Sequence, residues 1–310
     1  MSAAPSRDGH GRAPWAAAPA AATGWSQARA RVVRQRPYGE GHLWLELELP
    51  ARFGLPQAGQ FVQLLLIPPS PVLLPRPMSV AAARASGGAI VLGFLYAPIG
   101  AGTRALSQFE SGDHVDVLGP LGRGYPLDQP GTPVLVAGGR GVAPLLFAAD
   151  ALRRSGRRCE FFFGARSRAH LVGLDDARRH LARLGGRLHL ATDDGSRGFR
   201  GTVIELLDRA ARTLNPPLVL HACGPHGMLG ALARWALLHG ASAQLAMESV
   251  MACGTGVCRG CPMPRSAASS ERYRRARGDA PSLLGNAQYA MCCTEGPVFA
   301  ATDLDWDRVE

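Results

Sequence analysis

The chain has 310 residues, of which 46% are apolar, and this length is enough for two or three compact domains. Its formal net charge is +10, but the 34 basic residues are all arginines scattered along the sequence, so we expect no nucleic-acid binding. No apolar run reaches the roughly 18 residues of a membrane span, which predicts no membrane segment.

The first residues, 1–26, are rich in Ala, Pro and Gly, which predicts a disordered tail. This tail has no apolar core of the kind found in signal peptides. The seven cysteines are an odd number, and most of them gather near the C-terminus. These features favour a cytoplasmic protein with a metal site over a secreted disulfide framework.

Residues 27–128 contain short extended segments, which we expect to be strands at 43–49, 60–67, 89–96 and 114–118. In the first of these, leucine alternates with glutamate, as is typical of a half-buried strand. Glycine and proline turns separate the segments at the spacing of an antiparallel β-barrel. This region is therefore the first predicted domain.

Two motifs in this barrel suit a flavin. Arg76, Pro77 and Ser79 lie together, and they offer a cation for the phosphates and a hydrogen-bonding group for the isoalloxazine edge. Further along, Gly102 and Thr103 begin a predicted short helix whose free N–H groups suit phosphate. The pair predicts FAD binding, and an ordinary turn with a helix cap is the alternative.

Residues 129–245 alternate strands with helices. The strands are expected at 133–137, 159–163, 188–192 and 218–222, and the helices at 143–154, 175–184, 203–214 and 226–239. Uniformly apolar strands that alternate with helices are typical of a doubly wound parallel sheet covered on both faces. The predicted fold class is thus multidomain, β plus α/β.

Three loops at strand ends in this domain predict a dinucleotide site, because open parallel sheets bind ligands at the carboxyl ends of their strands. The site residues expected for NAD are Gly138, Gly139, Gly141, Pro144, Asp193, Cys223, Gly224 and Pro225. Cys223 is placed near the nicotinamide, and a small buried residue that closes the strand is the alternative. Hydride transfer needs no protein acid or base, so we assign no further catalytic residue. NADP remains an alternative to NAD, since Arg166 and Arg168 follow the second strand.

The last region, residues 246–310, holds four cysteines with a characteristic spacing. Cys253, Cys258 and Cys261 lie in one glycine-rich loop, and Cys293 follows after a gap of 31 residues. Four thiolates with this spacing predict a [2Fe–2S] cluster, and glycine lets such a loop take positive φ values close to the sulfurs. A zinc site or buried structural thiols are the alternatives. An arginine cluster at 265–277 is either a solvated loop or a docking surface for an acidic partner.

These motifs, in this order, resemble the ferredoxin reductase superfamily, and within it the electron transfer subunits of dihydroorotate dehydrogenase. The resemblance rests on Arg-Pro-Met-Ser at 76–79, Gly-Gly-Arg-Gly-Val-Ala-Pro at 138–144, Cys-Gly-Pro at 223–225, the cysteine loop at 251–261, and Cys-Thr-Glu-Gly-Pro-Val-Phe at 293–299. It implies that Met78 also contacts FAD. It also favours Cys293 over its neighbour Cys292 as the fourth cluster ligand.

The resemblance further implies a function and partners. The chain is expected to pass electrons between NAD and a catalytic dihydroorotate dehydrogenase subunit that carries FMN, through FAD and the cluster, in pyrimidine biosynthesis. The complex is expected to hold two copies of each subunit. The alternatives are a subunit of an NAD(P)H–ferredoxin or hydrogenase-type reductase with the same cofactors, and a non-catalytic module stabilised by zinc.

Overall fold

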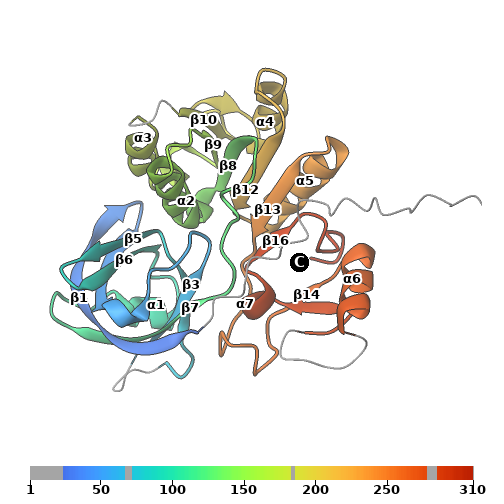
Figure 1. Cartoon of the computed structure of the whole chain (residues 1–310). Coiled ribbons are helices and arrows are strands. Elements are labelled where there is room, and N and C mark those ends of the chain that lie inside the picture. Colours follow the sequence, from blue (N-terminus) through green and yellow to red (C-terminus); the bar gives the residue numbers. More distant parts are fainter. Residues whose placement is uncertain (1–23, 67–71, 183–185, 278–284, 310) are drawn as a thin grey trace, which may run out of the picture.

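The computed structural model describes residues 24–66, 72–182, 186–277 and 285–309. A β-barrel, an α/β domain and a smaller C-terminal segment follow one another along the chain (Figure 1). The predicted tail lies outside the described residues up to position 23, and its last residue, Ser26, begins the first strand.

Seven antiparallel strands form the barrel sheet, in the order β4-β3-β7-β1-β2-β6-β5. They are β1 (Ser26–Gly39), β2 (His42–Pro50), β3 (Phe61–Leu65), β4 (Arg76–Ser79), β5 (Ala82–Ser86), β6 (Ala89–Tyr96) and β7 (His114–Leu121). The two edge strands, β4 and β5, follow one another directly in the sequence. Between them, the Val80 N–H donates to the Gln60 carbonyl, just before β3, and the Ala81 N–H donates to the Gly93 carbonyl of β6. The predicted antiparallel sheet is confirmed, and it curls until its edges meet.

In strand β2, apolar and acidic side chains alternate, and this alternation buries one face of the sheet. Leu45, Leu47 and Leu49 are almost fully buried inside the barrel. The intervening Glu46 and Glu48 face outward and accept hydrogen bonds from arginines of β1, at 2.6 and 2.8 Å. A 3₁₀ turn (Ala51–Phe53) and the short helix α1 (Ala101–Leu106) complete the domain.

The second sheet has the order β11-β10-β9-β8-β12-β13-β16 and is parallel except at its last strand. Its parallel strands are β8 (Thr132–Gly138), β9 (Glu160–Ala165), β10 (Arg187–Thr192), β11 (Phe199–Arg200), β12 (Leu218–Cys223) and β13 (Ser242–Ala246). The helices are α2 (Val142–Arg154), α3 (Leu174–Ala182), α4 (Val203–Ala211) and α5 (His226–Leu238). Two 3₁₀ turns, Gly139–Gly141 and Arg168–His170, follow strands β8 and β9.

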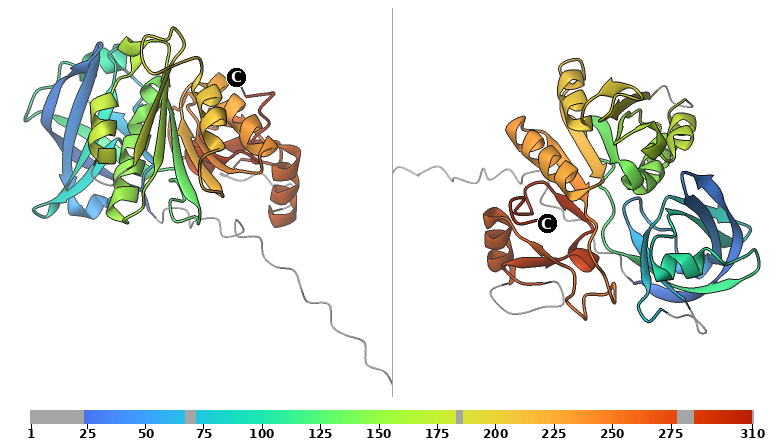
Figure 2. Two further views of the ribbon diagram at one scale, coloured as in Figure 1. Left: turned by 90° about the horizontal axis from the view of Figure 1, so that it is seen from above. Right: turned by 180° about the vertical axis from the view of Figure 1, so that it is seen from behind.

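Alternate residues of β8 divide the core of this domain in two. Leu135 and Ala137 pack with α2 and α3 in a core that is continuous with the barrel, whereas Val134 and Val136 pack with α4 and α5. The views from above and behind show the helices on both faces of the sheet (Figure 2). The predicted doubly wound parallel sheet is therefore confirmed. Helix α4 ends earlier than predicted, because the N–H groups of Thr213 and Leu214 donate to carbonyls three positions back, at Ala210 and Ala211, and so form turns.

The C-terminal segment contains β14 (Pro262–Pro264), helix α6 (Ala267–Arg277), β15 (Tyr289–Met291), the single turn α7 (Cys292–Glu295) and β16 (Val298–Ala300). It leaves the large sheet after β13 and returns to it as β16, which pairs antiparallel with β13. Its apolar residues share the second core with α5. Within the described ranges, no helix is both long and apolar enough to cross a membrane.

Candidate cofactor and cysteine site

The two segments predicted to bind FAD lie against each other. The side chain of Arg76 crosses the first turn of α1 so closely that a Cβ atom on Gly102 would lie 2.7 Å from the Arg76 Cδ atom. A side chain at position 102 would therefore displace the Arg76 side chain from this helix start. The Thr103 hydroxyl accepts a hydrogen bond from the Gly100 N–H at 3.0 Å and so fixes the turn before the helix. A cation and free helical N–H groups thus meet at one point, as a phosphate group requires.

The other predicted FAD residues follow Arg76 along the edge strand β4. Met78 is buried in the barrel core, whereas Pro77 and Ser79 are exposed. Ser79 pairs with Phe61 of β3, and Pro77 pairs with Gln63. Proline suits this strand because the outer side of an edge strand needs no donor N–H group.

Replacement of Arg76 by alanine is expected to weaken FAD retention by about tenfold to a hundredfold, the range for loss of a charge-assisted hydrogen bond. The FAD-to-protein ratio after gel filtration measures the effect. Arg84→Ala is the matched control, because Arg84 is another barrel arginine, with only a loose 3.8 Å contact to Glu46. Equal FAD content in both variants would contradict the role of Arg76.

The glycine loops predicted to bind NAD meet where the strand order of the large sheet reverses, between β8 and β12. A Cβ atom on Gly141 would lie 2.2 Å from the carbonyl oxygen of Cys223. One on Gly138 would lie 2.5 Å from Met228 Sδ, and one on Gly224 would lie 3.1 Å from the Gly138 backbone. These glycines let the two loops touch backbone to backbone at the switch point, where open sheets bind nucleotides.

The remaining nucleotide-site residues have distinct positions around this point. Gly139 has a φ of +52° and open space beside it, while Pro144 is buried in the first turn of α2. Asp193 is exposed at the end of β10, and its N–H donates to the Ala165 carbonyl at the end of β9. Cys223 ends β12 and is 3% exposed. Burial and the nearby Glu248 carboxylate raise its pKa well above the usual value, so it stays a neutral thiol.

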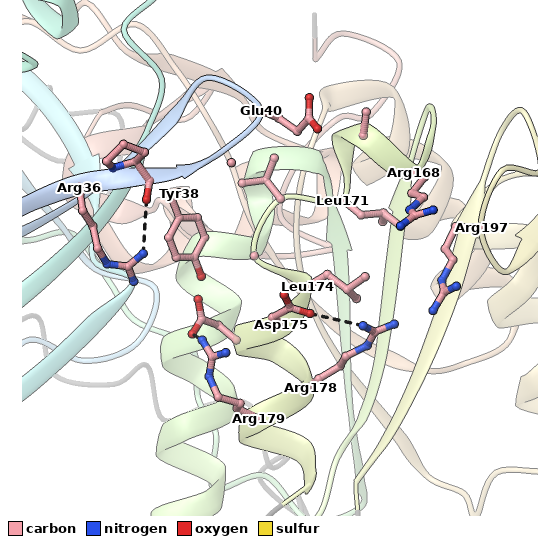
Figure 3. A pocket seen from close by; sticks show the side chains of 16 residues that line it. Arg36, Tyr38, Glu40, Arg168, Leu171, Leu174, Asp175, Arg178, Arg179 and Arg197 are labelled. Atoms are coloured by element: carbon pink, nitrogen blue, oxygen red, sulfur yellow. Dashed lines mark hydrogen bonds and ion pairs between the residues drawn. The ribbon is translucent and has the colours of Figure 1, made fainter.

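A cavity of about 510 Å³ lies between the barrel hairpin at 36–40 and the ends of β9 and β10 (Figure 3). Arg168 and Arg197 approach it from the large sheet, and Arg36 with Tyr38 from the barrel. In a doubly wound sheet the adenosine half of a dinucleotide extends in this direction from the pyrophosphate. Arg166, also considered from the sequence, is absent from the residues that line the cavity.

The four predicted cluster ligands lie as two pairs. In the first pair, the backbone N–H groups of Thr255 and Cys258 both donate to Cys253 Sγ, at 3.4 Å, and the Cys258 thiol also hydrogen-bonds to it. In the second pair, the Cys293 N–H donates to Cys261 Sγ at 3.4 Å. The loop reaches this conformation through positive φ values at Gly254, Gly256 and Arg259. Cys258 is exposed, whereas Cys261 and Cys293 are buried.

These contacts favour thiolates. Burial alone would raise the pKa of Cys253, but the N–H groups of Cys258 and Thr255 outweigh it and lower the pKa to about 6. The Cys293 thiol donates to Cys261 and lowers its pKa to about 7, which in turn raises the pKa of Cys293 itself. Backbone donors aimed at sulfur and lowered thiol pKa values fit a site for a thiolate-bound cluster.

Among the described residues, no three Cys, His, Asp or Glu side chains converge on one point where a single metal ion would bind. Two thiol pairs nevertheless match what a cluster with two iron atoms needs, because each iron takes two protein sulfurs. Cys292 belongs to neither pair. Its thiol is fully buried and donates to the Met247 carbonyl at 3.8 Å, whereas its N–H donates to the Cys261 carbonyl at 2.9 Å.

The arginine cluster at 265–277 divides into buried and exposed members. Arg265 is nearly buried, forms an ion pair with Glu295 and stacks on Tyr273, so it stabilises the C-terminal segment. Arg272 pairs with Asp303, and Arg275 with Glu271. Several of the charges considered for docking are thus neutralised within the chain.

Residues 122–125, between the barrel and the large sheet, had not been predicted as part of the site. The Tyr125 hydroxyl donates to the Ala222 carbonyl at 2.9 Å, next to Cys223. The Arg123 N–H donates to the Gly296 carbonyl of the C-terminal segment. A Cβ atom on Gly122 would lie 2.5 Å from Pro297. This linker therefore touches all three parts of the molecule. In the sequence, Gly122 and Gly124 were the signal that could have indicated such close packing.

Comparison with known proteins gives consistent results. The model of the oxidoreductase NAD-binding domain family matches residues 135–234. The electron transfer subunit of dihydroorotate dehydrogenase B (NAD(+)) from Desulforamulus reducens is 33% identical over 85% of this chain and 92% of its own length. The same subunit from Geobacillus thermodenitrificans is 32% identical over 88% and 95%. Among solved structures, an NADH-dependent reduced ferredoxin–NADP oxidoreductase has a TM-score of 0.71 and 24% identity, covering 90% of this chain and 91% of that one.

Proposed function

Since this chain belongs to the family of electron transfer subunits of NAD⁺-linked dihydroorotate dehydrogenase B, we propose that it moves electrons between NAD and a partner that oxidises dihydroorotate. The chain is an oxidoreductase subunit and a flavoprotein. The observation that carries the proposal is the order of three sites along one molecule: the arginine–glycine contact in the barrel, the glycine switch point of the large sheet, and the paired thiols.

Each site has residues for one group. Arg76, Gly102 and Thr103 would hold the FAD pyrophosphate, with Pro77, Met78 and Ser79 along the flavin. Gly138, Gly139, Gly141 and Pro144 would hold the pyrophosphate of NAD, with Asp193, Cys223, Gly224 and Pro225 around the rest of that nucleotide. Cys253, Cys258, Cys261 and Cys293 would hold a [2Fe–2S] cluster, and this completes the proposed C-terminal cluster domain.

When bound, FAD supplies the conversion between hydride transfer and single-electron transfer, and the cluster carries single electrons. The chain's own residues position these groups. Tyr125 anchors the linker to β12 beside Cys223, which keeps the barrel close to the nucleotide loops. The buried Cys223 stays uncharged, so it offers a small neutral surface where the nicotinamide would lie.

The partner is proposed to be the FMN-containing catalytic subunit, in a complex with two copies of each chain in the cytoplasm, where free thiols persist. The surface of this chain that binds the partner is proposed to lie near the exposed Cys258 and Val257, because single electrons transfer efficiently only over a short distance between the cluster and the partner's cofactor. The chain would thereby serve pyrimidine biosynthesis.

The test is to purify the full chain anaerobically, alone and with the catalytic subunit. We expect flavin and [2Fe–2S] absorbance bands, reduction of the flavin by NADH, and NAD⁺ reduction by dihydroorotate only in the complex. Parallel titrations of flavin reduction with NADH and with NADPH decide which of the two nucleotides binds at the cavity lined by Arg168 and Arg197. A colourless protein that contains zinc would contradict the proposal, as would efficient ferredoxin reduction with no binding of the catalytic subunit.

A further inference from the structure

Gln63 is a fully buried polar residue between the proposed flavin strand and the cysteine loop. It lies in β3, where its neighbours Val62 and Leu64 point into the barrel core. Because side chains alternate along a strand, Gln63 faces the other way, as does Phe61, which packs in the second core together with Cys261 and Cys293. Gln63 thus reaches from the barrel toward the thiol pairs.

The side chain of Gln63 contacts the backbone on both sides of Cys253. Its Nε2 donates to the Ala252 carbonyl at 3.4 Å. On the other side, a Cβ atom on Gly254 would lie 2.8 Å from Gln63 Cγ and 3.0 Å from Nε2. Gly254 has a φ of +75°, so both its conformation and its contact with Gln63 require glycine. Across the sheet, Gln63 is paired with Pro77 of β4.

Packing alone does not account for glutamine at this position. In the described part of the chain the Gln63 Oε1 atom is buried and has no hydrogen-bond partner. A buried acceptor without a donor is unfavourable, and methionine would fill the same space without that cost. The favourable contribution of glutamine is therefore its N–H group, which holds the backbone directly before Cys253.

We propose that Gln63 is the positioning residue that couples the flavin-binding strands to the cysteine loop and fixes the place and the reduction potential of the cluster. The inference rests on the proposed function. By holding the Ala252 carbonyl and packing on Gly254, Gln63 keeps the loop in the conformation in which the N–H groups of Thr255 and Cys258 point at Cys253 Sγ. Such donors around the sulfurs set the potential of an iron–sulfur centre.

Gln63→Met in the full chain tests this coupling, with Gln60→Met as the matched control. Gln60 is also buried, but both ends of its amide have partners, the Gly122 carbonyl and the Gln57 N–H, each at 2.8 Å. In each variant we would measure FAD, iron and acid-labile sulfide, the cluster midpoint potential by EPR-monitored titration, and the rate of cluster reduction after mixing with NADH.

Gln63→Met is expected to keep FAD and iron, to shift the cluster to a more negative potential with an altered EPR spectrum, and to slow cluster reduction by about tenfold. Gln60→Met is expected to lower the melting temperature and leave the potential and the spectrum unchanged. Should Gln63→Met fail to fold, Gln63→Leu also removes the donor without adding a charge, and it should shift the potential in the same direction.

An unchanged potential, spectrum and rate in the Gln63 variants would overturn the inference while leaving the proposed function intact. Wild-type protein that binds FAD but no iron would contradict the proposed function itself, and this inference with it.

Discussion

Replacement of Cys258 by serine is expected to abolish the cluster and to reduce electron delivery to the catalytic subunit by about 100-fold or more. Cys258 is the exposed member of its pair, and both its N–H and its thiol lie at Cys253 Sγ. Serine keeps the backbone donor but removes a sulfur ligand. NADH should still reduce the flavin, since the hydrogen bonds that Cys258 forms in the described part of the chain go to Cys253, and flavin reduction precedes electron transfer to the cluster. Iron content and stopped-flow spectra measure both effects.

Cys292→Ser is the control for this prediction. The Cys292 thiol points to the Met247 carbonyl, and serine retains a donor there. We expect this variant to keep its iron, although burial of a hydroxyl will lower stability slightly. Loss of iron from the Cys292 variant, with retention in the Cys258 variant, would show that the ligand set is wrong.

Gly141→Ala is expected to impair nucleotide binding strongly. The new methyl group would lie 2.2 Å from the Cys223 carbonyl oxygen and 2.6 Å from the Gly224 nitrogen, and neither backbone can retreat without opening the switch point. We expect a loss of about 3 kcal/mol in the free energy of unfolding. The KM for NADH should rise by about 100-fold, because the loop before α2 is displaced.

Gly230→Ala is the matched control in helix α5. There the added methyl group meets only ordinary contacts, at 3.5 Å and beyond, and alanine favours a helix by about 1 kcal/mol over glycine. Its NADH kinetics should match those of the wild type. A Gly141→Ala protein with wild-type KM and thermal stability would show that the loops do not pack as described.

The sequence was most informative where local pattern and chemistry coincide. The alternating leucines of β2 predicted the antiparallel sheet, because a strand buried on one face alternates apolar and polar residues. The continuous apolar run of β8 predicted the parallel sheet, because a strand buried on both faces is apolar throughout. The glycines at 138, 141 and 224 predicted where the loops would be. These positions need glycine because the loops after β8 and β12 touch each other. That contact depends on the order of the strands in the sheet, which no local sequence pattern encodes.

Other features depend on contacts between distant segments. Helix α6 was not predicted because it has no large aliphatic residue, so no apolar stripe marks it. Tyr273 and Ser269 are its buried members. Gln63 looked like one polar residue inside an apolar run, and only the position of Gly254 gives it a role. Arg265 was grouped with a surface patch, although its partner Glu295 lies 30 residues away.

The return of the chain as β16 bears on biosynthesis of the protein. β13 emerges from the ribosome before the four proposed cluster cysteines, and its outer edge pairs with β16, which is made after them. Until Val298–Ala300 has been synthesised, that edge presents unsatisfied amide and carbonyl groups to any other extended peptide. Insertion of the proposed cluster would thus fall in the same interval of synthesis as closure of this edge, and nascent chains that stall in between would be exposed to aggregation.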